Sequence, residues 1–438
     1  MVLKEGTRIR SDKGTEITVE KLLGEGGQGH VYRVNYRGTT MALKIYKPGV
    51  IANPQFFFEN LTRNAELSEP PSEAFVWPRD TVRLKNGARG YVMDFMTKPY
   101  VSFEKFLLPL GSGGVRFHSF KTIIDAMINL VCAFQKLHIL GYSYQDLNDG
   151  NFFFNPATGD VKICDNDNVA YNKMNTGVIG KPRYIAPEVV LGKNMPDAQS
   201  DRFSLAVILF MMMTISHPLE GRRFLAELIT PQMERRLYAE EPIFVMHPTD
   251  KRNGIDPSRP HLFSNLTFMW NWMPQELRNL FARAFSDEVL KDPSKRIRED
   301  VWLQTLLLVR NRFVTCPHCL KETVYQRKER MVCEDCRKEI PLRFFVIEKT
   351  QKIHPISWNA QLCRGHIGYA NQGKSGECMV RVARSRSSGR LFFTNVSGGP
   401  VHITLRDGRT ETLQHAASCQ ADNVTALEIG QTMVTVKE

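Results

Sequence analysis

The hydrophobic pattern of the chain changes twice, and these changes limit the folds it can adopt. Apolar and polar residues alternate in short runs between residues 15 and 95, which predicts strands. From residue 119 the apolar side chains recur every three or four positions, as Ile123, Met127, Leu130 and Phe134 do, which predicts helices. Alternation returns after residue 341. We therefore expect an α+β chain with a β-rich lobe, a helical lobe, a cleft between them and a β-rich tail.

The length of 438 residues is too great for one hydrophobic core. We predict a bilobal domain over residues 1–312, with lobes at about 1–96 and 97–312. A cysteine-rich unit would follow at 313–340 and a small all-β, sandwich-like domain at 341–438.

The charge and the apolar runs of the chain bear on its partners and its cellular location. The net charge of +12 is spread over all three regions, so a nucleic-acid partner is not expected on charge alone. The N-terminus has no apolar core, and the longest apolar run, residues 205–215, is shorter than the ~20 residues that span a bilayer. We predict a cytoplasmic protein without a membrane segment.

Two motifs in the β-rich lobe suit phosphate binding. Residues 24–31 (GEGGQGHV) contain four glycines, which let backbone N–H groups approach phosphate oxygens. Residues 41–44 (MALK) place Lys44 at the end of an apolar strand, where its ammonium could meet phosphates. Alone, the first motif could equally be a hairpin turn without a ligand, and Lys44 could be a surface lysine.

A third motif lies in the helical lobe. Residues 144–151 (YQDLNDGN) precede a strand that ends in Asp165. Asn151 and Asp165 offer the oxygen ligands that Mg²⁺ prefers, and Asp146 could accept a proton from an attacking hydroxyl. The alternative is a polar loop without catalytic chemistry.

The order of these motifs resembles that of the Hanks-type, or eukaryotic-like, Ser/Thr protein kinases over roughly residues 15–312. Residues 144–151 stand for the family's H-R-D-L-x-x-x-N, residues 165–167 (DND) for its D-F-G, and residues 186–188 for its A-P-E. Asp201 matches the buried Asp that opens an apolar helix, and Arg296 matches the partner of the A-P-E glutamate, Glu188.

The resemblance implies the bilobal kinase fold, ATP with Mg²⁺ or Mn²⁺ as cofactors, and protein substrates. Asp146 would be the catalytic base, and Asn151 and Asp165 the Mg²⁺ ligands. The implied nucleotide-binding residues are Gly24, Gly26, Gly29, Val31, Ala42, Lys44, Asp94 and Met96.

The family pairs its strand lysine with a glutamate of a helix. Here that helix is expected at 54–68, and Glu59 and Glu66 are seven residues apart on one face of it. Both are candidates, and Glu59 is preferred because it lies nearer the middle of the helix.

Several residues depart from the family pattern. Gln145 replaces the Arg that receives an activation-loop phosphate, so we predict activity without loop phosphorylation. Tyr144 and Asn166 replace the family His and Phe that pack beneath the site. Asn148 stands where a Lys contacts the γ-phosphate; we hypothesise that Lys181 supplies that charge, the alternative being an exposed loop lysine.

The DND motif, the Q-D loop and the absence of a membrane segment are similar to a bacterial stand-alone subgroup. Its members are associated with von Willebrand A-type proteins and PP2C-type phosphatases in tellurite-resistance triads, which would be the implied partners.

Two Cys-x-x-Cys pairs predict a closed metal site. Cys316 and Cys319 precede Cys333 and Cys336, and four thiolates form a tetrahedral, structural Zn²⁺ site in a zinc ribbon. A redox dithiol is the alternative, but it would need only one pair. The tail behind this unit faintly resembles a forkhead-associated sandwich, without the motifs that hold phosphothreonine.

The sequence thus predicts an active Ser/Thr protein kinase. A pseudokinase scaffold that binds ATP is the second interpretation, supported by the substitutions at 144, 145, 148 and 166. A nucleic-acid-binding zinc ribbon with a regulatory kinase domain is the third.

Overall fold

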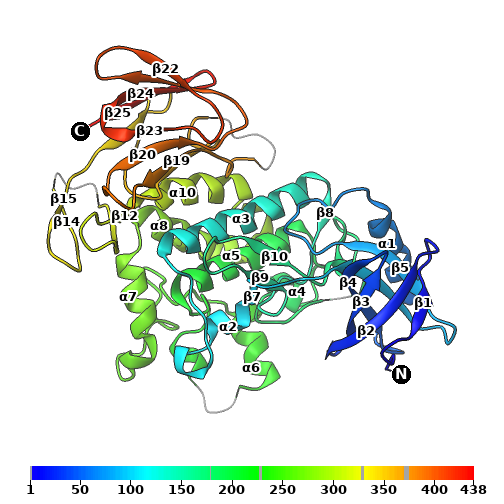
Figure 1. Cartoon of the computed structure of the whole chain (residues 1–438). Helices are drawn as coiled ribbons and strands as arrows, with labels where there is room; N and C mark the ends of the chain where they lie inside the picture. Colours follow the sequence, from blue (N-terminus) through cyan, green and yellow to red (C-terminus); the bar gives the residue numbers. More distant parts are fainter. Residues whose placement is uncertain (1, 178, 226–228, 327–329, 369–373) are drawn as a thin grey trace.

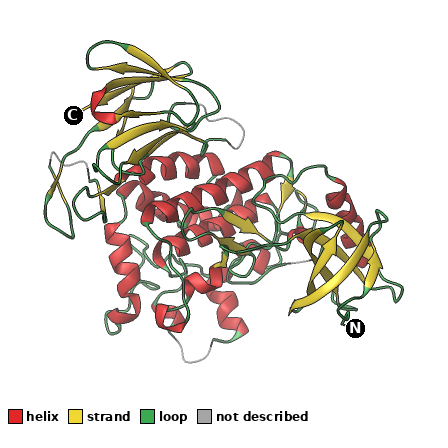
Figure 2. Cartoon of the chain, in the orientation of Figure 1, coloured by secondary structure: helices red, strands yellow, loops and turns green. Residues whose placement is uncertain are grey.

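A computed structural model gives the fold of the chain, and it describes all residues except 1, 178, 226–228, 327–329 and 369–373. Figure 1 shows a strand-rich N-terminal lobe, a central helical lobe and a β-rich C-terminal region at the far end of the molecule. The same division into strands, helices and strands is visible in Figure 2. The two changes of hydrophobic pattern therefore correspond to real changes of architecture.

The N-terminal lobe is one antiparallel sheet with a helix against it. The strand order is β1-β2-β3-β4-β6-β5. Asn53 caps the helix, its side chain accepting from the Phe56 backbone N–H, and Pro54 occupies the first turn. The elements are β1 (Arg8–Arg10), β2 (Glu16–Glu25), β3 (Gly29–Tyr36), β4 (Thr39–Tyr46), α1 (Pro54–Glu66), β5 (Pro78–Arg83) and β6 (Arg89–Asp94).

The helical lobe is built around α3 (Phe120–Ile139) and α5 (Ala198–Thr214). Ser119 and Asp197 begin these helices with capping boxes, and α5 is buried on every side. The other helices are α2 (Phe103–Leu107), α4 (Pro187–Val190), α6 (Pro231–Arg235), α7 (Ser264–Trp272), α8 (Gln275–Ala284), α9 (Asp287–Lys291) and α10 (Glu299–Arg312).

Short strands of the helical lobe carry the loops of the site. Strands β10, β9 and β7 form one small sheet, and β11 pairs with β8. Their bounds are β7 (Val101–Ser102), β8 (Tyr142–Ser143), β9 (Phe152–Phe154), β10 (Val161–Ile163) and β11 (Ala170–Tyr171). The single-turn helices are η1 (Leu110–Ser112), η2 (Asn166–Asn168), η3 (Arg222–Phe224), η4 (Arg236–Glu240), η5 (Pro260–Phe263) and η6 (Pro293–Lys295).

Helix α3 is long and apolar enough to cross a bilayer by length and composition. However, 67% of its apolar window is buried inside the protein, among the side chains of the helical lobe. It is therefore placed as a core helix.

The C-terminal part contains two hairpins and then two facing sheets. The hairpins are β12 (Phe313–Thr315) with β13 (Glu322–Val324), and β14 (Met331–Val332) with β15 (Glu339–Ile340). One sheet has the order β17-β16-β25-β24-β21-β22 and the other β18-β19-β20-β23. The strands are β16 (Phe344–Ile347), β17 (Lys352–Pro355), β18 (Gln361–Cys363), β19 (Cys378–Arg384), β20 (Leu391–Asn395), β21 (Val401–Leu405), β22 (Thr410–Leu413), β23 (Ser418–Gln420), β24 (Val424–Ile429) and β25 (Thr432–Lys437), with η7 (Ala421–Asn423).

Side chains from both sheets form one apolar core, including Phe345, Leu362, Phe393 and Leu427. The tail is therefore a β-sandwich, as the alternation of its residues predicts. The forkhead-associated resemblance and the domain boundaries at 312 and 340 stay predictions.

Candidate active site

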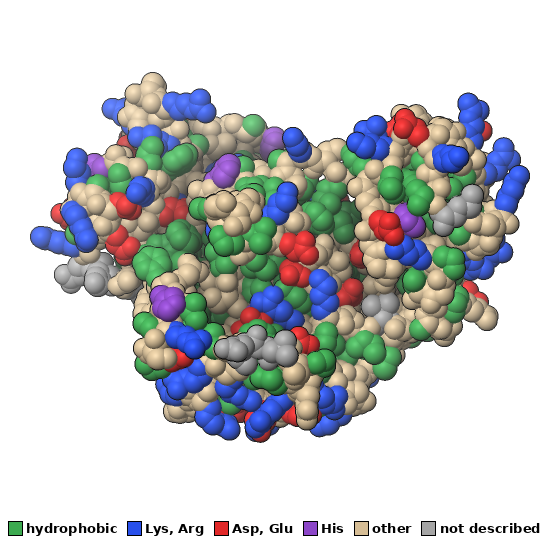
Figure 3. Space-filling model, turned by 90° about the horizontal axis from the view of Figure 1, so that it is seen from below, with side chains coloured by type: hydrophobic (Ala, Val, Ile, Leu, Met, Phe, Trp, Pro, Cys, Tyr) green, Lys and Arg blue, Asp and Glu red, His purple; other side chains and the backbone are tan. Residues whose placement is uncertain are grey.

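Four of the predicted site residues come from three segments that meet between the lobes. Asp146 and Asn151 lie on the loop between β8 and β9, Asp165 follows β10, and Lys44 comes from β4. Figure 3 shows acidic and basic side chains gathered on the face between the strand-rich lobe, at the right, and the helical lobe.

Hydrogen bonds from side-chain amides stabilise the conformation of the loop around Asp146. The Asn151 Nδ2 atom donates to the Asp146 backbone oxygen at 2.9 Å and to its Oδ2 at 3.2 Å. The Asn148 Nδ2 atom donates to Asp146 Oδ1 at 3.0 Å. Because the Asn151 nitrogen is engaged, its amide oxygen is the atom that remains for a cation. Asp146 and Asn151 are thus adjacent, as predicted.

Burial dominates the electrostatics of Asp146. Desolvation raises the pKa of this carboxyl to about 6; the hydrogen bond from Asn148 opposes the shift, and the Asp165 charge adds to it. The influence of Asp165 on Asp146 is consistent with the two carboxylates sharing one site. A pKa nearer neutrality suits a group that must take up a proton.

Asp165 and Lys44 form the other half of the site. The Lys44 ammonium is 3.2 Å from Asp165 Oδ1 and 2.8 Å from Asp167 Oδ2. Burial alone would lower the pKa of Lys44, but the Asp167 and Asp165 carboxylates outweigh it and hold the pKa above its ordinary value. Asp165 has left-handed backbone angles and its side chain is 40% exposed, so it can reach a ligand in the cleft.

The glycine motif forms the loop between β2 and β3. The Gly26 N–H donates to the Gly29 oxygen at 2.9 Å and closes the turn. A Cβ atom at Gly29 would lie 2.3 Å from the Ile45 oxygen, so this glycine is required by backbone packing against β4. Gly24 and Gly26 have open space around them. The Gln28 side chain reaches Lys44 Nζ at 3.0 Å, which brings the loop over the site.

Two of the residues implied to bind the nucleotide, Val31 and Ala42, lie together. Ala42 and Met93 are buried in one apolar cluster, and Val31 and Cys164 pack against it. Asp94 ends β6 and pairs with Arg79 at 2.8 Å, and the half-buried Met96 follows.

The prediction that Glu59 pairs with Lys44 is not what the structure shows. Glu59 and Glu66 share a face of α1, but that face is exposed, and Glu59 accepts from Gln55 at 3.1 Å. The inward face presents Phe57 and Leu61 to the core. Helical spacing places residues on a common face but does not say which face is turned inward.

Lys181 lies beside the catalytic loop. Its Nζ atom is 3.1 Å from Asp149 Oδ1, and the Lys181 side chain is 55% exposed. Asn148, whose place it is predicted to take, is buried. The neighbouring Gly180 has φ +85°, and a Cβ there would lie 3.1 Å from Asp146 Oδ1. The segment of Lys181 therefore passes directly over the catalytic carboxylate.

Asp201 and Arg296 lie where the resemblance implies. Asp201 accepts from the Tyr144 and Gln145 backbone N–H groups at 2.6 and 2.8 Å, which fixes the start of the catalytic loop. Arg296 forms two hydrogen bonds to Glu188, at 2.8 and 2.6 Å.

The side chains at the substituted positions 144 and 166 form hydrogen bonds to backbone oxygens. The Tyr144 hydroxyl donates to the Cys164 oxygen, and the buried Asn166 amide donates to the Val76 and Ile163 oxygens. These polar side chains are tied to the backbone.

Asp167, which was not predicted as a site residue, is fully buried beneath Lys44. The only signal for it was a charged residue at the third position of DND, where the family pattern has glycine.

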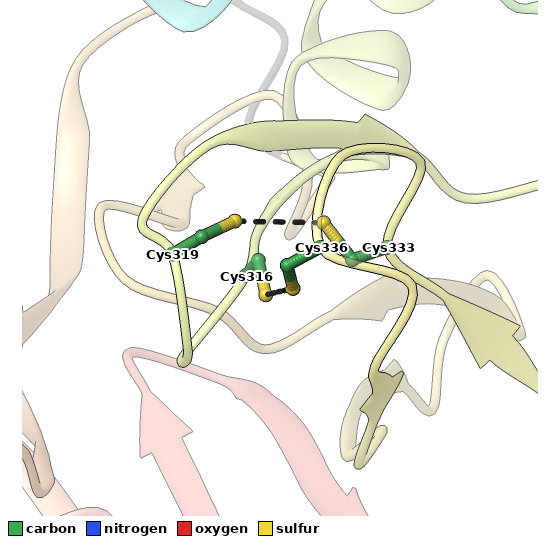
Figure 4. Close-up of side chains that lie close together, drawn as sticks. All are labelled: Cys316, Cys319, Cys333 and Cys336. Carbon is green, nitrogen blue, oxygen red and sulfur yellow. Dashed lines mark hydrogen bonds between the residues drawn. The ribbon is translucent and has the colours of Figure 1, made fainter.

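The four cysteines of the two pairs converge (Figure 4). Cys316 and Cys336 are 3.7 Å apart at sulfur, Cys319 and Cys333 are 3.6 Å apart, and all four sulfurs lie within 4.8 Å of one another. A Zn–S bond of about 2.3 Å places the sulfurs of a tetrahedral site roughly 3.8 Å apart. The cluster therefore has the size and donor set that suit Zn²⁺.

Comparison with known proteins agrees with this geometry. Residues 17–298, more than half of the chain, match the family model described as protein kinase domain. The chain belongs to the protein kinase family, and the resemblance to Hanks-type Ser/Thr kinases is confirmed.

The relatives include bacterial and viral proteins. The chain is 24% identical over 326 residues to "Protein kinase YegI" of Escherichia coli O157:H7, which covers 69% of this chain and 46% of that protein. It is 26% identical over 216 residues to "Probable serine/threonine-protein kinase SCO3848" of Streptomyces coelicolor, covering 46% and 30%. With "Putative serine/threonine-protein kinase/receptor R831" of Acanthamoeba polyphaga mimivirus it shares 24% over 216 residues, covering 47% and 13%. The matched regions thus span less than half of these relatives.

Proposed function

We propose that the chain is a protein kinase that uses ATP and Mg²⁺ to phosphorylate Ser and Thr hydroxyls of proteins. The observation that carries this proposal is the meeting of Asp146 and Asn151 on one side of the site with Asp165 and Lys44 on the other. These are the groups that phosphoryl transfer needs: a carboxylate for the hydroxyl, oxygen ligands for the metal and a cation for the phosphates.

Each side chain then has a role that its position supports. Asp146 orients the substrate hydroxyl and accepts its proton. Asn151 and Asp165 would hold Mg²⁺ or Mn²⁺, which supplies charge neutralisation on the phosphates when bound. Lys44 holds the α- and β-phosphates, and the loop of Gly24, Gly26 and Gly29 covers them. Val31 and Ala42 enclose the adenine, and the chain at Asp94 and Met96 binds its edge.

The test is transfer of labelled γ-phosphate from ATP with Mg²⁺ to a generic basic protein, followed by phosphoamino-acid analysis. We expect phosphoserine and phosphothreonine, and a loss of about 100-fold or more in Asp146→Asn because the base is removed. Asp160→Asn, in the exposed turn between β9 and β10, is the matched control.

A pseudokinase scaffold is the second candidate, and the replaced residues Tyr144, Gln145, Asn148 and Asn166 favour it. Nucleotide binding by calorimetry together with transfer no faster than that of Asp146→Asn would establish the scaffold and end the catalytic proposal.

We also propose that Cys316, Cys319, Cys333 and Cys336 bind a structural Zn²⁺. Two of the four, Cys316 and Cys333, are buried in a small apolar cluster with Val314, Met331 and Ile340. A unit this small needs a metal to fold stably.

Elemental analysis of the full-length protein is expected to give one zinc ion per chain, lost in Cys319→Ser and Cys336→Ser. Cys419→Ser, in the tail, is the control that keeps the metal. A Cys319–Cys333 disulfide found by mass spectrometry in the protein as purified would support the redox alternative instead.

The proposed setting is the cytoplasm, with a von Willebrand A-type protein and a PP2C-type phosphatase as partners. These proposals rest on the similarity of the DND and Q-D motifs to the bacterial subgroup. Co-purification of tagged full-length protein from its own cells would test them, and recovery of neither partner would count against them.

A further inference from the structure

Helix α1 supplies no carboxylate to Lys44. Two of its side chains, Asn60 and Asn64, are fully buried and donate to the Val169 oxygen, at 2.7 and 2.8 Å. The two acidic residues of the helix, Glu59 and Glu66, are exposed. An amide carries no net charge. These asparagines therefore tie α1 to the segment after DND but do not neutralise the positive charge of Lys44.

The carboxylate that faces Lys44 most closely comes from Asp167. Its Oδ2 atom accepts from Lys44 Nζ at 2.8 Å and from the Tyr46 hydroxyl. Asp167 is 0% exposed and the Lys44 side chain 5%. A charge this deeply buried is retained only when it is paired, because unpaired burial costs several kcal/mol.

Tyr46 completes the enclosure of the ion pair. It lies two residues after Lys44 on β4, and its ring centroid is 5.3 Å from Lys44 Nζ. The ring also packs edge-on against Phe57 and Phe58 of α1, with centroid distances of 5.3 and 5.5 Å. The ammonium is thereby confined between Asp165, Asp167 and an aromatic wall, with Gln28 on its remaining side.

We infer that Asp167 is the positioning residue for Lys44, holding its ammonium at the phosphate-binding point in place of a helix glutamate. The inference rests on the proposed function, since it assigns a role within the same site. Asp167 is two residues from Asp165, the proposed Mg²⁺ ligand. The lysine is therefore positioned by the segment that binds the metal, and a shift of α1 does not separate the ion pair.

The test is a double-mutant cycle on ATP binding and on turnover. Asp167→Asn removes the charge with little change in shape, and Asp167→Gly restores the family's residue without leaving an unpaired amide. We expect each to weaken Mg²⁺–ATP affinity and to lower kcat/KM for ATP by about 10- to 100-fold, the range for breaking a charged hydrogen bond. In a Lys44→Met background, the same changes are expected to alter ATP affinity less than about twofold.

The matched control is Asp80→Asn. Asp80 is also 0% exposed, lies in the same lobe and accepts from a tyrosine hydroxyl, that of Tyr36 at 2.9 Å, but it does not contact Lys44. The Asp80→Asn variant shows how much stability is lost when any buried carboxylate is removed. Thermal unfolding of all variants measures that loss. The ATP affinity of Asp80→Asn is expected to match that of the wild type.

Three outcomes would overturn the inference: wild-type ATP affinity in both Asp167 variants, equal losses with and without Lys44, or a large loss in Glu59→Gln alone. The binding arm does not depend on turnover. If wild type transfers no more phosphate than Asp146→Asn, the proposed function fails, while the cycle on ATP affinity still decides the role of Asp167.

Discussion

Gln145 changes how the segment after DND is held. It has a positive φ of 73°, and its side-chain amide donates to Ser143 Oγ at 2.8 Å and to the Met174 oxygen at 2.6 Å. Its Oε1 atom accepts from Asn175 at 2.8 Å. Neutral hydrogen bonds therefore order this segment directly, where an arginine would require a phosphate.

Thr176 provides the test of that arrangement. It is 1% exposed, and its hydroxyl has no hydrogen-bond partner among the described residues. We expect Thr176→Ala to keep kcat within about threefold of wild type, because Gln145 already orders this segment and no hydrogen bond to a described residue is lost. Steady-state assays before and after phosphatase treatment measure this. A tenfold loss that Thr176→Glu reverses would contradict it.

Lys181 is the second residue-scale prediction. Its ammonium is held by Asp149 in the catalytic loop, and Asn148 has no charge to offer the γ-phosphate. We expect Lys181→Ala to lower kcat by about 10-fold or more, because one cationic contact to the transferred group is lost. Lys193→Ala, an exposed lysine further along the same segment, is the control. An unchanged kcat in Lys181→Ala would refute the hypothesis that Lys181 supplies the positive charge that is missing at position 148.

The site residues that could be predicted are those that a short local motif identifies. Lys44, Asp146, Asn151 and Asp165 belong to this group, and the structure brings them to one site. The sequence did not allow the lysine's partner to be chosen, because that choice depends on how α1 is rotated against the sheet. Asp167 was hidden for a related reason: its role appears only when β4 and η2 are packed together.

At the scale of elements, a buried charge network joins three helical-lobe segments. His138 of α3 lies 3.0 Å from Asp201 of α5 and 2.8 Å from Glu299 of α10. Glu299 also pairs with Arg202 at 2.9 Å. Since Asp201 holds the catalytic loop through the Tyr144 and Gln145 N–H groups, the protonation of His138 bears on the stability of the site.

Burial lowers the pKa of His138, but the Asp201 and Glu299 carboxylates outweigh it and raise the pKa to about 9. A raised histidine pKa stabilises the fold fully below about pH 6.5, and that contribution is lost as pH rises through 9. We expect His138→Gln to lower the free energy of unfolding by at most about 3 kcal/mol at pH 6.5 and by much less at pH 10. Denaturant unfolding across this range measures it, and a pH-independent difference would contradict the assignment.

Elements were predictable in proportion to their length. The period of α3 and the alternation in β2 and β3 extend over several residues, so their side chains reveal the buried face. Strands β7, β8 and β11 have two residues each and show no period. The strand order of the tail was equally out of reach, because pairing partners such as β16 and β25 lie far apart in sequence.

At the scale of the whole molecule, the tail is joined to the helical lobe through buried polar contacts. The fully buried Arg310 of α10 binds Asp125 of α3, at 2.9 Å, and the Asn359 oxygen of the tail, at 2.7 Å. Lys121 of α3, also buried, donates to Thr315 and to the Trp358 oxygen, at 2.7 and 2.6 Å. The sandwich is thereby fixed at the end of the molecule opposite the glycine loop (Figure 1).

Breaking this junction is expected to be costly. Arg310→Met leaves the Asp125 carboxylate and the Asn359 oxygen without their donor, and we expect it to destabilise the fold by about 3–5 kcal/mol. Arg298→Met, which breaks an exposed pair with Asp300 at the start of the same helix, is the control and should cost less than about 1 kcal/mol. Thermal and chemical unfolding compare the two, and equal effects would show that the junction contributes little.

The absence of a spacer after α10 has a consequence for how such a protein can change in evolution. Arg312 ends the helix and Phe313 begins β12, so no linker separates the helical lobe from the first hairpin behind it. Deleting the sandwich would expose buried apolar side chains such as Ile128 and Leu307, which lie against Gly376 and Gly365 of the tail, whereas a domain on a flexible linker can be lost without exposing a core. Descendants that discard this module must first replace the apolar side chains that the junction would expose, such as Ile128 and Leu307, because the charged Lys121 and Arg310 are readily hydrated.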